Sequence, residues 1–217
     1  MAQSSIVLDR RQQVAVETNK VLRNTYALLA LTLLFSAATA TVSMAVNFPY
    51  LGLWMLLPYF GLLFAVEKTK NSGWGLAWVF ALTGWMGLTL GPILNFYAGL
   101  NGYTPILLAL AGTAGIFLAL SAYVLITRKD LSFMTGFLMT GMLVAFIAAI
   151  ANVFLQISAL GLVISSMFLV VSSGLIMWQT SAIIHGGERN YISATVTLYV
   201  MLYNIFTILL SFLGQDD

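Results

Sequence analysis

The sequence predicts an all-α integral membrane protein that crosses the bilayer about seven times. The 217-residue chain is 60% hydrophobic and only 7% charged, whereas an ordinary soluble domain has roughly 25% charged residues. Its mean hydropathy is +0.96. A water-soluble domain of this length could not cover its surface with so few charges, so lipid must be the solvent for most of the chain.

Seven apolar segments are long enough to span, since a helix needs roughly 20 residues to cross about 30 Å of hydrocarbon. We place them at residues 26–46, 50–66, 74–96, 103–126, 133–155, 159–183 and 191–213. The second is short and contains Pro58, so it could be kinked, and length alone leaves six or eight spans open.

Residues 1–23 are polar and of mixed charge, and we expect a cytoplasmic tail there, ahead of a membrane domain at 24–217. A cleaved signal peptide is the alternative, because Ala38-Thr39-Ala40 resembles a cleavage site. The long polar region with acidic residues before the first apolar run argues against it.

Orientation follows from the positive charges, because Lys and Arg in short loops stay on the cytoplasmic side. With the amino end inside, all nine Lys and Arg residues fall inside, and the connections near residues 47–49, 95–102 and 156–158 carry no charge. We therefore predict a multi-pass membrane protein with its amino end in the cytoplasm and its carboxyl end on the opposite side of the membrane. The charged inner connections contain, among others, Arg128, Lys129, Asp130, His185, Glu188 and Arg189.

Turn and packing residues fit these spans. Pro105 suits the first turn of the fourth helix, and Gly186-Gly187 can end the sixth. Gly91-Pro92 should bend the third helix and free backbone carbonyls that a neighbouring helix or water must satisfy. Pairs of small residues at helix-packing spacing should let backbones approach; they are Gly87 and Gly91, Ser36 and Ala40, and Ala145 and Ala149.

No constellation typical of an enzyme is present in the sequence. The chain has no cysteine and one histidine, which excludes thiol chemistry and multi-histidine metal sites. We predict no cofactor, no metal site and no nucleic-acid binding. His185, Ser132 and Asp130 could share the cytoplasmic face, but a chance grouping in loops is the simpler interpretation. His185 could sense pH, or it could cap a helix.

Four amide side chains, Asn152, Gln156, Gln179 and Asn204, fall within or at the ends of the predicted spans. In lipid such groups either form hydrogen bonds between helices or line a polar cavity. We favour the first role. Because Asn152 and Gln156 are one helical turn apart, they could instead line an outward-facing vestibule.

Several motifs together resemble a known family. They are Lys20-Val21-Leu22-Arg23-Asn24-Thr25-Tyr26, Gly91-Pro92-Ile93-Leu94-Asn95, Ser121-Ala122-Tyr123 with 127–132, Ala151-Asn152, and Ile183-Ile184-His185-Gly186-Gly187-Glu188 with Asn190-Tyr191. From about Lys20 to Gly214 the chain resembles the bacterial YccA-like branch of the Bax inhibitor-1 family. The His-Gly-Gly-Glu loop, in register with Leu198-Tyr199 and Asn204, is the most specific of these features.

The resemblance implies a fold in which six helices surround a central seventh. It also implies two possible functions. YccA-like proteins interact with the FtsH-type membrane AAA protease as substrate and modulator, whereas other family members are pH-sensitive calcium leaks that use paired aspartates on the sixth and seventh helices. Here those positions are Gln179 and Met201, which cannot ionise and are poor ligands for calcium.

The resemblance therefore implies a regulator in the bacterial inner membrane, with its carboxyl end in the periplasm, that binds and modulates an FtsH-type protease and could also be its substrate. Residues 1–23 would be the segment that the unfoldase grips. A tail that only sets topology is the alternative role for that segment. A cation leak or small transporter is the alternative function, weakened by the missing aspartates. Neither the oligomeric state nor the surface that meets a partner can be read from the sequence.

Overall fold

The structure, a computed structural model, describes the backbone of residues 2–214 and the side chains of residues 16–214, and this part of the chain contains helices and no strands. Two short 3₁₀ turns, Gly52–Met55 and Ser132–Met134, precede α2 and α5. The seven α-helices are α1 (Ala2–Ala45), α2 (Leu56–Thr69), α3 (Trp74–Asn101), α4 (Thr104–Thr127), α5 (Thr135–Leu155), α6 (Ser158–Ile184) and α7 (Tyr191–Leu213).

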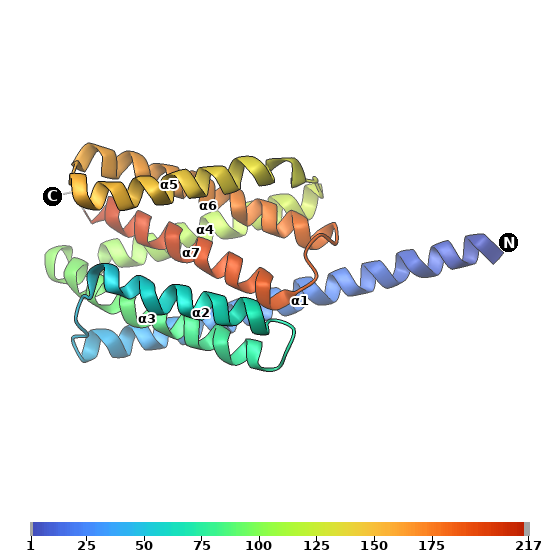
Figure 1. Cartoon of the computed structure of the whole chain (residues 1–217), viewed down its shortest axis with the longest axis horizontal. Coiled ribbons are helices and arrows are strands. Elements are labelled where there is room, and N and C mark those ends of the chain that lie inside the picture. Colours follow the sequence, from blue (N-terminus) through green and yellow to red (C-terminus); the bar gives the residue numbers. More distant parts are fainter. Residues whose placement is uncertain (1, 215–217) are drawn as a thin grey trace.

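Six of these helices are long and apolar enough to cross a membrane, α1 being counted from Val16. The remaining helix, α2, has 14 residues and follows a four-residue 3₁₀ turn. At about 1.5 Å per α-helical residue and about 2.0 Å per 3₁₀ residue, the two together rise by about 29 Å, close to the thickness of the hydrocarbon. Figure 1 shows α2 running beside α3 along the bundle, so its length and position fit the predicted short second crossing.

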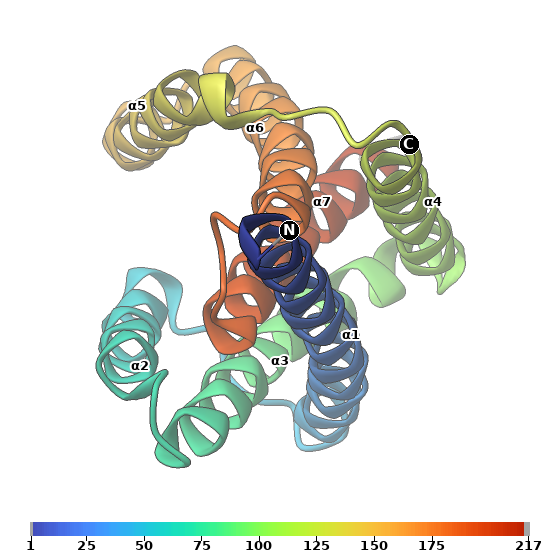
Figure 2. The ribbon, with the colours of Figure 1, turned by 90° about the vertical axis from the view of Figure 1, so that its right-hand side faces the viewer.

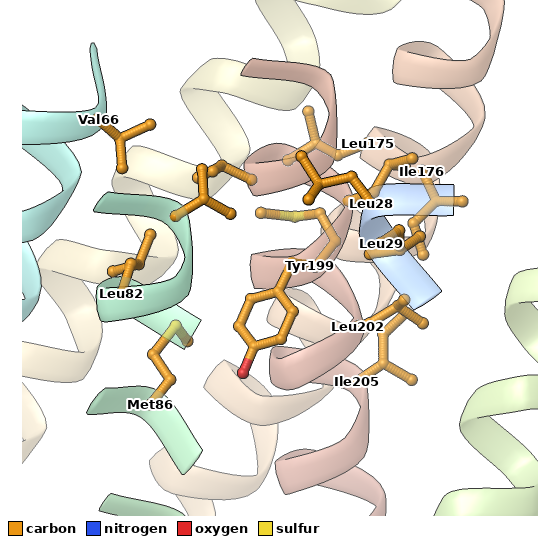
Figure 3. Close-up of a cluster of buried hydrophobic side chains, with 14 of the residues drawn as sticks. Leu28, Leu29, Val66, Leu82, Met86, Leu175, Ile176, Tyr199, Leu202 and Ile205 are labelled. Carbon is orange, nitrogen blue, oxygen red and sulfur yellow. The ribbon is translucent and has the colours of Figure 1, made fainter. Parts of the chain in front are cut away.

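Helix α7 lies at the centre of the bundle (Figure 2), as the family resemblance implied. It packs against α1, α2, α3, α4 and α6, and each of its residues is buried or half-buried. Tyr199, which is 1% exposed, sits in the main apolar cluster with residues of α1, α2, α3 and α6 (Figure 3). By contrast α5 buries only Leu138 and Ala145 and packs mainly on α6, so it is the peripheral helix.

Glycines bring α1 and α3 into close contact, as the small-residue pattern predicted. A Cβ atom added to Gly87 would lie 2.0 Å from Thr39 Oγ1 and 2.3 Å from the Ser36 carbonyl oxygen. One added to Gly91 would lie 2.1 Å from Ser43 Oγ. Since real Cβ atoms do not approach other atoms so closely, the two backbones can meet only because these residues are glycines.

Pro92 lies inside α3 and leaves the carbonyl of Leu88, four residues earlier, without its helical donor. The hydroxyl of Ser43 on α1 donates a hydrogen bond of 2.6 Å to that carbonyl. A neighbouring helix therefore supplies the missing donor, as we expected from the sequence. Ser43 on α1 thus compensates for the hydrogen bond that Pro92 removes from α3.

Other turn predictions are also confirmed. Pro105 lies in the first turn of α4. Gly186, with φ of +75°, follows the end of α6. The N–H groups of Gly187 and Gly186 donate to the carbonyls of Ala182 and Ile183, which is the hydrogen-bond pattern of a Schellman C-cap.

The polar segment at the start of the chain is helical. Helix α1 runs without interruption from Ala2 to Ala45 and projects beyond the rest of the bundle (Figure 1). The boundary that we drew between residues 23 and 24 is therefore not a break in secondary structure. Once a helix is nucleated by the buried part of α1, each added residue costs little, so polar residues can extend it.

Candidate functional site

The charged connections meet at one end of the bundle, which we call the charged end. It comprises the α2–α3, α4–α5 and α6–α7 connections and the projecting part of α1. Every Lys and Arg from Lys20 onward lies at this end, whereas the connections at the opposite end carry no charge. The charge separation that we predicted from the loops is thus a property of the folded bundle.

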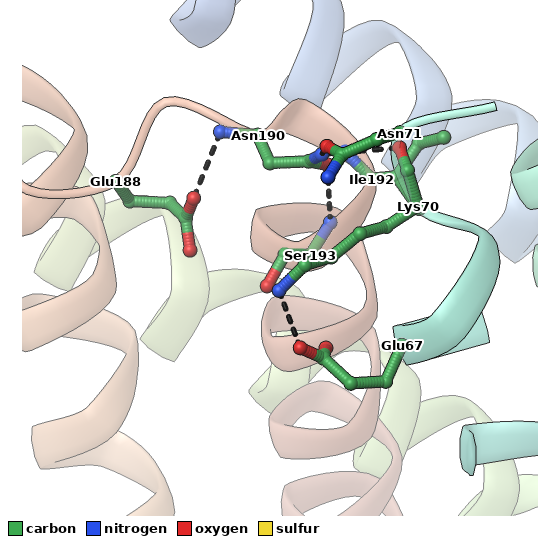
Figure 4. A network of polar contacts seen from close by, with 7 residues as sticks. All are labelled: Glu67, Lys70, Asn71, Glu188, Asn190, Ile192 and Ser193. Atoms are coloured by element: carbon green, nitrogen blue, oxygen red, sulfur yellow. Dashed lines mark hydrogen bonds and ion pairs between the residues drawn. The ribbon is translucent and has the colours of Figure 1, made fainter.

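Asn190 joins two of these connections (Figure 4). Its side-chain oxygen caps α7 by accepting hydrogen bonds from the N–H groups of Ile192 and Ser193, at 2.9 and 3.1 Å. Its side-chain nitrogen donates to the Lys70 carbonyl at 3.0 Å and to Asn71 Oδ1 at 2.8 Å. One amide therefore fixes the start of the central helix and ties it to the α2–α3 turn.

Glu188 completes this corner by accepting a hydrogen bond of 2.8 Å from the backbone N–H of Asn190. Beside it, Lys70 and Glu67 form an ion pair one turn apart at the end of α2. Sequence reasoning did not single out Asn190 as a structural centre. The signal was present, because Asn is a preferred N-cap and this one directly precedes the apolar run of α7.

His185 and Ser181 hold the other charged connection against α6. His185 Nδ1 lies 2.9 Å from the Ser181 carbonyl oxygen, and Nε2 lies 3.1 Å from that of Arg128. The Ser181 hydroxyl donates to the Lys129 carbonyl and accepts from the Leu131 N–H, both at 3.0 Å. His185 thus has the capping role at the end of α6, and it contacts one backbone oxygen of the α4–α5 connection, that of Arg128.

Asp130 turns its carboxylate to the start of the next helical segment. Its Oδ1 accepts a hydrogen bond of 2.9 Å from the backbone N–H of Ser132. That bond, the Ser132 hydroxyl and the nearby His185 hold the pKa of Asp130 below its usual value. Asp130, Ser132 and His185 do share the charged end, but each makes its described contacts with loop and helix-end backbone.

The four amides that we singled out do not come together. Asn152 accepts a hydrogen bond of 3.1 Å from the Ile157 N–H and so closes the end of α5, while Gln156 is an exposed residue just beyond it with φ of +53°. Both lie at the uncharged end. Gln179, which is 2% exposed, lies five residues from the charged end of α6, and Asn204 is half-buried within α7.

Buried hydroxyls around α7 form contacts that the sequence did not reveal. Tyr199 donates a hydrogen bond of 2.5 Å to Ser36 Oγ on α1, and its hydroxyl lies 3.3 Å from the Thr83 carbonyl oxygen on α3. Gln179 Nε2 is also buried, but it has no hydrogen-bond partner within the described side chains. The polar groups of the core are therefore partly paired and partly unpaired.

Comparison with known proteins identifies the relationship. The model of the family described as "Inhibitor of apoptosis-promoting Bax1" matches residues 18–217, which is most of the chain. This chain belongs to the Bax inhibitor-1 family. The resemblance inferred from its loop motifs is thereby confirmed.

Proteins similar to this chain are found in several bacteria. The chain is 54% identical to the Escherichia coli (strain K12) protein named "Modulator of FtsH protease YccA", over 92% of this chain and 91% of that one. It is 54% identical to an uncharacterised protein of Pseudomonas aeruginosa, over 91% and 90% of the two chains. A Vibrio cholerae membrane protein is 48% identical over 92% and 91%.

Within this Bax inhibitor-1 protein, the two positions that the resemblance assigns to paired aspartates are occupied by buried, non-ionisable residues. Gln179 is 2% exposed and Met201 is 8% exposed. In the part of the chain whose side chains are described, no three His, Asp or Glu residues group as a metal site would require.

Proposed function

We propose that this protein is a polytopic inner-membrane protein that binds an FtsH-type AAA protease and modulates its action on membrane proteins. One observation carries the proposal. A relative that is 54% identical over nearly the whole of both chains is named as a modulator of that protease. A further relative of equal identity is named an inner membrane protein.

The bundle supports this proposal through its charged end. If short basic connections mark the cytoplasmic side, the charged end faces the cytoplasm and the carboxyl end faces the periplasm. The projecting part of α1 then stands free of the bundle at the cytoplasmic surface. An unfoldase must engage an accessible segment of a protein before it can pull, and the projecting part of α1 is accessible in this way.

The direct test is affinity purification from native membranes. The protein, tagged at its carboxyl end, is solubilised in mild detergent, and the bound proteins are identified by mass spectrometry. We expect an FtsH-type protease to be enriched relative to an unrelated polytopic protein with the same tag. Absence of the protease under conditions that keep its own complexes intact would refute the proposal.

A second test addresses the amino-terminal segment. We expect deletion of residues 2–15 to lengthen the half-life of the protein in pulse-chase, because the protease loses its point of engagement. A matched control replaces the same residues with an unrelated polar sequence of equal length, which should restore turnover. If the deleted protein decays at the original rate, the segment is not the protease handle.

A cation leak is the second candidate, and one observation favours it. The unpaired Gln179 Nε2 on α6 and the unpaired Ser121 hydroxyl on α4 lie five and six residues from the charged ends of their helices. At 1.5 Å per residue both are about 8 Å deep. Buried polar groups without partners attract water, and water is a prerequisite for ion passage.

Ion flux into liposomes that contain the purified protein tests this candidate. Substitutions at Gln179, Asn152 or Asn204 should change the flux, whereas Gln156→Leu at the exposed end of α5 serves as the control. Silent liposomes would remove the leak function and leave the protease proposal untouched.

A further inference from the structure

A cleft of about 300 Å³ lies at the charged end, between α1 and the α6–α7 connection. Its α1 wall contains Glu17, Lys20 and Val21, which recur every three to four residues and so share one face of the helix. Its opposite wall contains Glu188 and Arg189. Figure 2 looks onto this end and shows α1 passing beside the connection that leads into α7.

The cleft is lined by two acidic and two basic side chains, which form no ion pair with one another within residues 16–214. Glu17 and Glu188 face the same space as Lys20 and Arg189. Arg189 donates only its Nε–H to a described acceptor, the Gly186 carbonyl oxygen at 3.3 Å. The other four donors of its guanidinium make no described hydrogen bond and are available to an anion.

The position of the cleft along the helix axes indicates which ligand can reach it. It lies where the helical connections begin, next to Tyr191, the first residue of α7. Helices of a membrane protein leave the hydrocarbon at this level and enter the headgroup layer, where Tyr is also enriched. Val21 and Tyr191 supply apolar wall beside the charged groups. A lipid headgroup is therefore the ligand that this position presents to the cleft.

The chemistry of the walls selects among headgroups. A phosphate suits Lys20 and Arg189, and an ammonium group suits Glu17 and Glu188. A primary ammonium can donate hydrogen bonds to both carboxylates, whereas a quaternary ammonium cannot and is usually bound by an aromatic cage. A purely anionic headgroup would place its charge against the two glutamates. We propose that this cleft binds the phosphoethanolamine headgroup of a membrane phospholipid.

Native mass spectrometry of the detergent-solubilised full chain tests the proposal. The protein is incubated with phosphatidylethanolamine, phosphatidylcholine or phosphatidylglycerol of identical acyl chains, and the retained lipid is counted. We expect phosphatidylethanolamine to be retained about threefold better than either competitor, because each exposed charge contact changes the affinity by only a few-fold. Equal retention of the three lipids would overturn the proposal.

Substitutions locate the binding in the cleft. Lys20→Gln combined with Arg189→Gln should lower phosphatidylethanolamine retention about fivefold, whereas Lys68→Gln, at the same end but outside the cleft, should not. Glu17→Gln should shift the preference toward phosphatidylglycerol. If the double variant does not fold, Lys20→Gln alone on the exposed face of α1 gives the same readout. Unchanged retention in the cleft variants would overturn the site.

Two further experiments distinguish binding of the headgroup from binding of the acyl chains and from binding of a protein segment. Soluble glycerophosphoethanolamine should displace the lipid when added in excess, since the headgroup carries the recognition. A lipid that glycerophosphoethanolamine does not displace would be held by its acyl chains elsewhere, which overturns the proposal. If cross-linking from position 20 in native membranes captures a protein segment and no lipid, the cleft is a protein-docking site and the proposal is likewise overturned.

Discussion

Replacing Gly87 by alanine should push α1 away from α3. The new Cβ atom would lie 2.3 Å from the Ser36 carbonyl oxygen, and a backbone oxygen cannot rotate out of the way. Restoring an ordinary contact distance requires α1 to retreat by about 1 Å. That movement would stretch the hydrogen bond from Tyr199 to Ser36 Oγ and the bond from Ser43 to α3, which measure 2.5 and 2.6 Å.

The cost can be estimated from these contacts. Overpacking costs about 1–3 kcal/mol, and a weakened buried hydrogen bond adds about 1 kcal/mol. Alanine recovers about 1 kcal/mol through its higher helix propensity. The free energy of unfolding should therefore fall by about 1–3 kcal/mol, which corresponds to a Tm lower by roughly 2–12 °C for a chain of this size.

Gly115→Ala is the matched control. Gly115 also lies inside a helix, but an added Cβ would meet nothing within 4 Å. Its Tm should stay the same or rise slightly. Thermal unfolding in detergent, followed by tryptophan fluorescence, measures both variants. Equal Tm values for the two alanine variants would refute the close α1–α3 packing.

Three further predictions concern hydrogen bonds at the ends and in the middle of the bundle. Ser43→Ala should lower the free energy of unfolding by about 1–2 kcal/mol. The loss should be smaller in a Pro92→Ala background, because the alanine restores a backbone N–H donor to the Leu88 carbonyl. If chemical denaturation shows the two effects to be additive, Ser43 does not compensate for Pro92. Asn190→Ala should cost about 1–2 kcal/mol, whereas Asn190→Asp keeps the cap and loses only the donors to Lys70 and its neighbour, so it should cost less in the same assay. Because the pKa of Asp130 is lowered in the fold, its stabilising contribution is present above the ordinary aspartate pKa of about 3.9 and is lost as the pH falls through the lowered value. The Tm difference between wild type and Asp130→Asn should therefore shrink as the pH is lowered below about pH 4.

Much of the fold was predictable because lipid imposes simple rules. Apolar length predicted seven helices, and the predicted bounds of α4, α5, α6 and α7 lie within two residues of those observed. The starts of α1 and α2 were predicted less well, because α1 begins in the polar segment at Ala2 and α2 begins only at Leu56. Local rules also predicted that a neighbour would satisfy the carbonyl freed by Pro92, though not that Ser43 would do so. Proline, glycine and hydrophobic length act within a few residues, so they can be read directly from sequence.

Contacts between distant residues could not be predicted in this way. Asn190 binds Lys70, which is 120 positions earlier, and His185 binds the backbone of Arg128. Helical spacing suggested that Asn152 and Gln156 share a face, but the helix ends between them and the first closes its last turn. Such pairings depend on how the helices assemble, which no local pattern specifies.

Site-directed labelling tests the central claim, that the chain crosses the membrane seven times with its charged end in the cytoplasm. Because the sequence contains no cysteine, single cysteines at Phe48, Ser72, Asn101 and Gly187 can be probed without background. We predict that a membrane-impermeant maleimide added to cells with a permeabilised outer membrane labels positions 48 and 101, and that it labels 72 and 187 only after the inner membrane is disrupted. Labelling of positions 48 and 72 from the same side would show that α2 does not cross and would contradict the account.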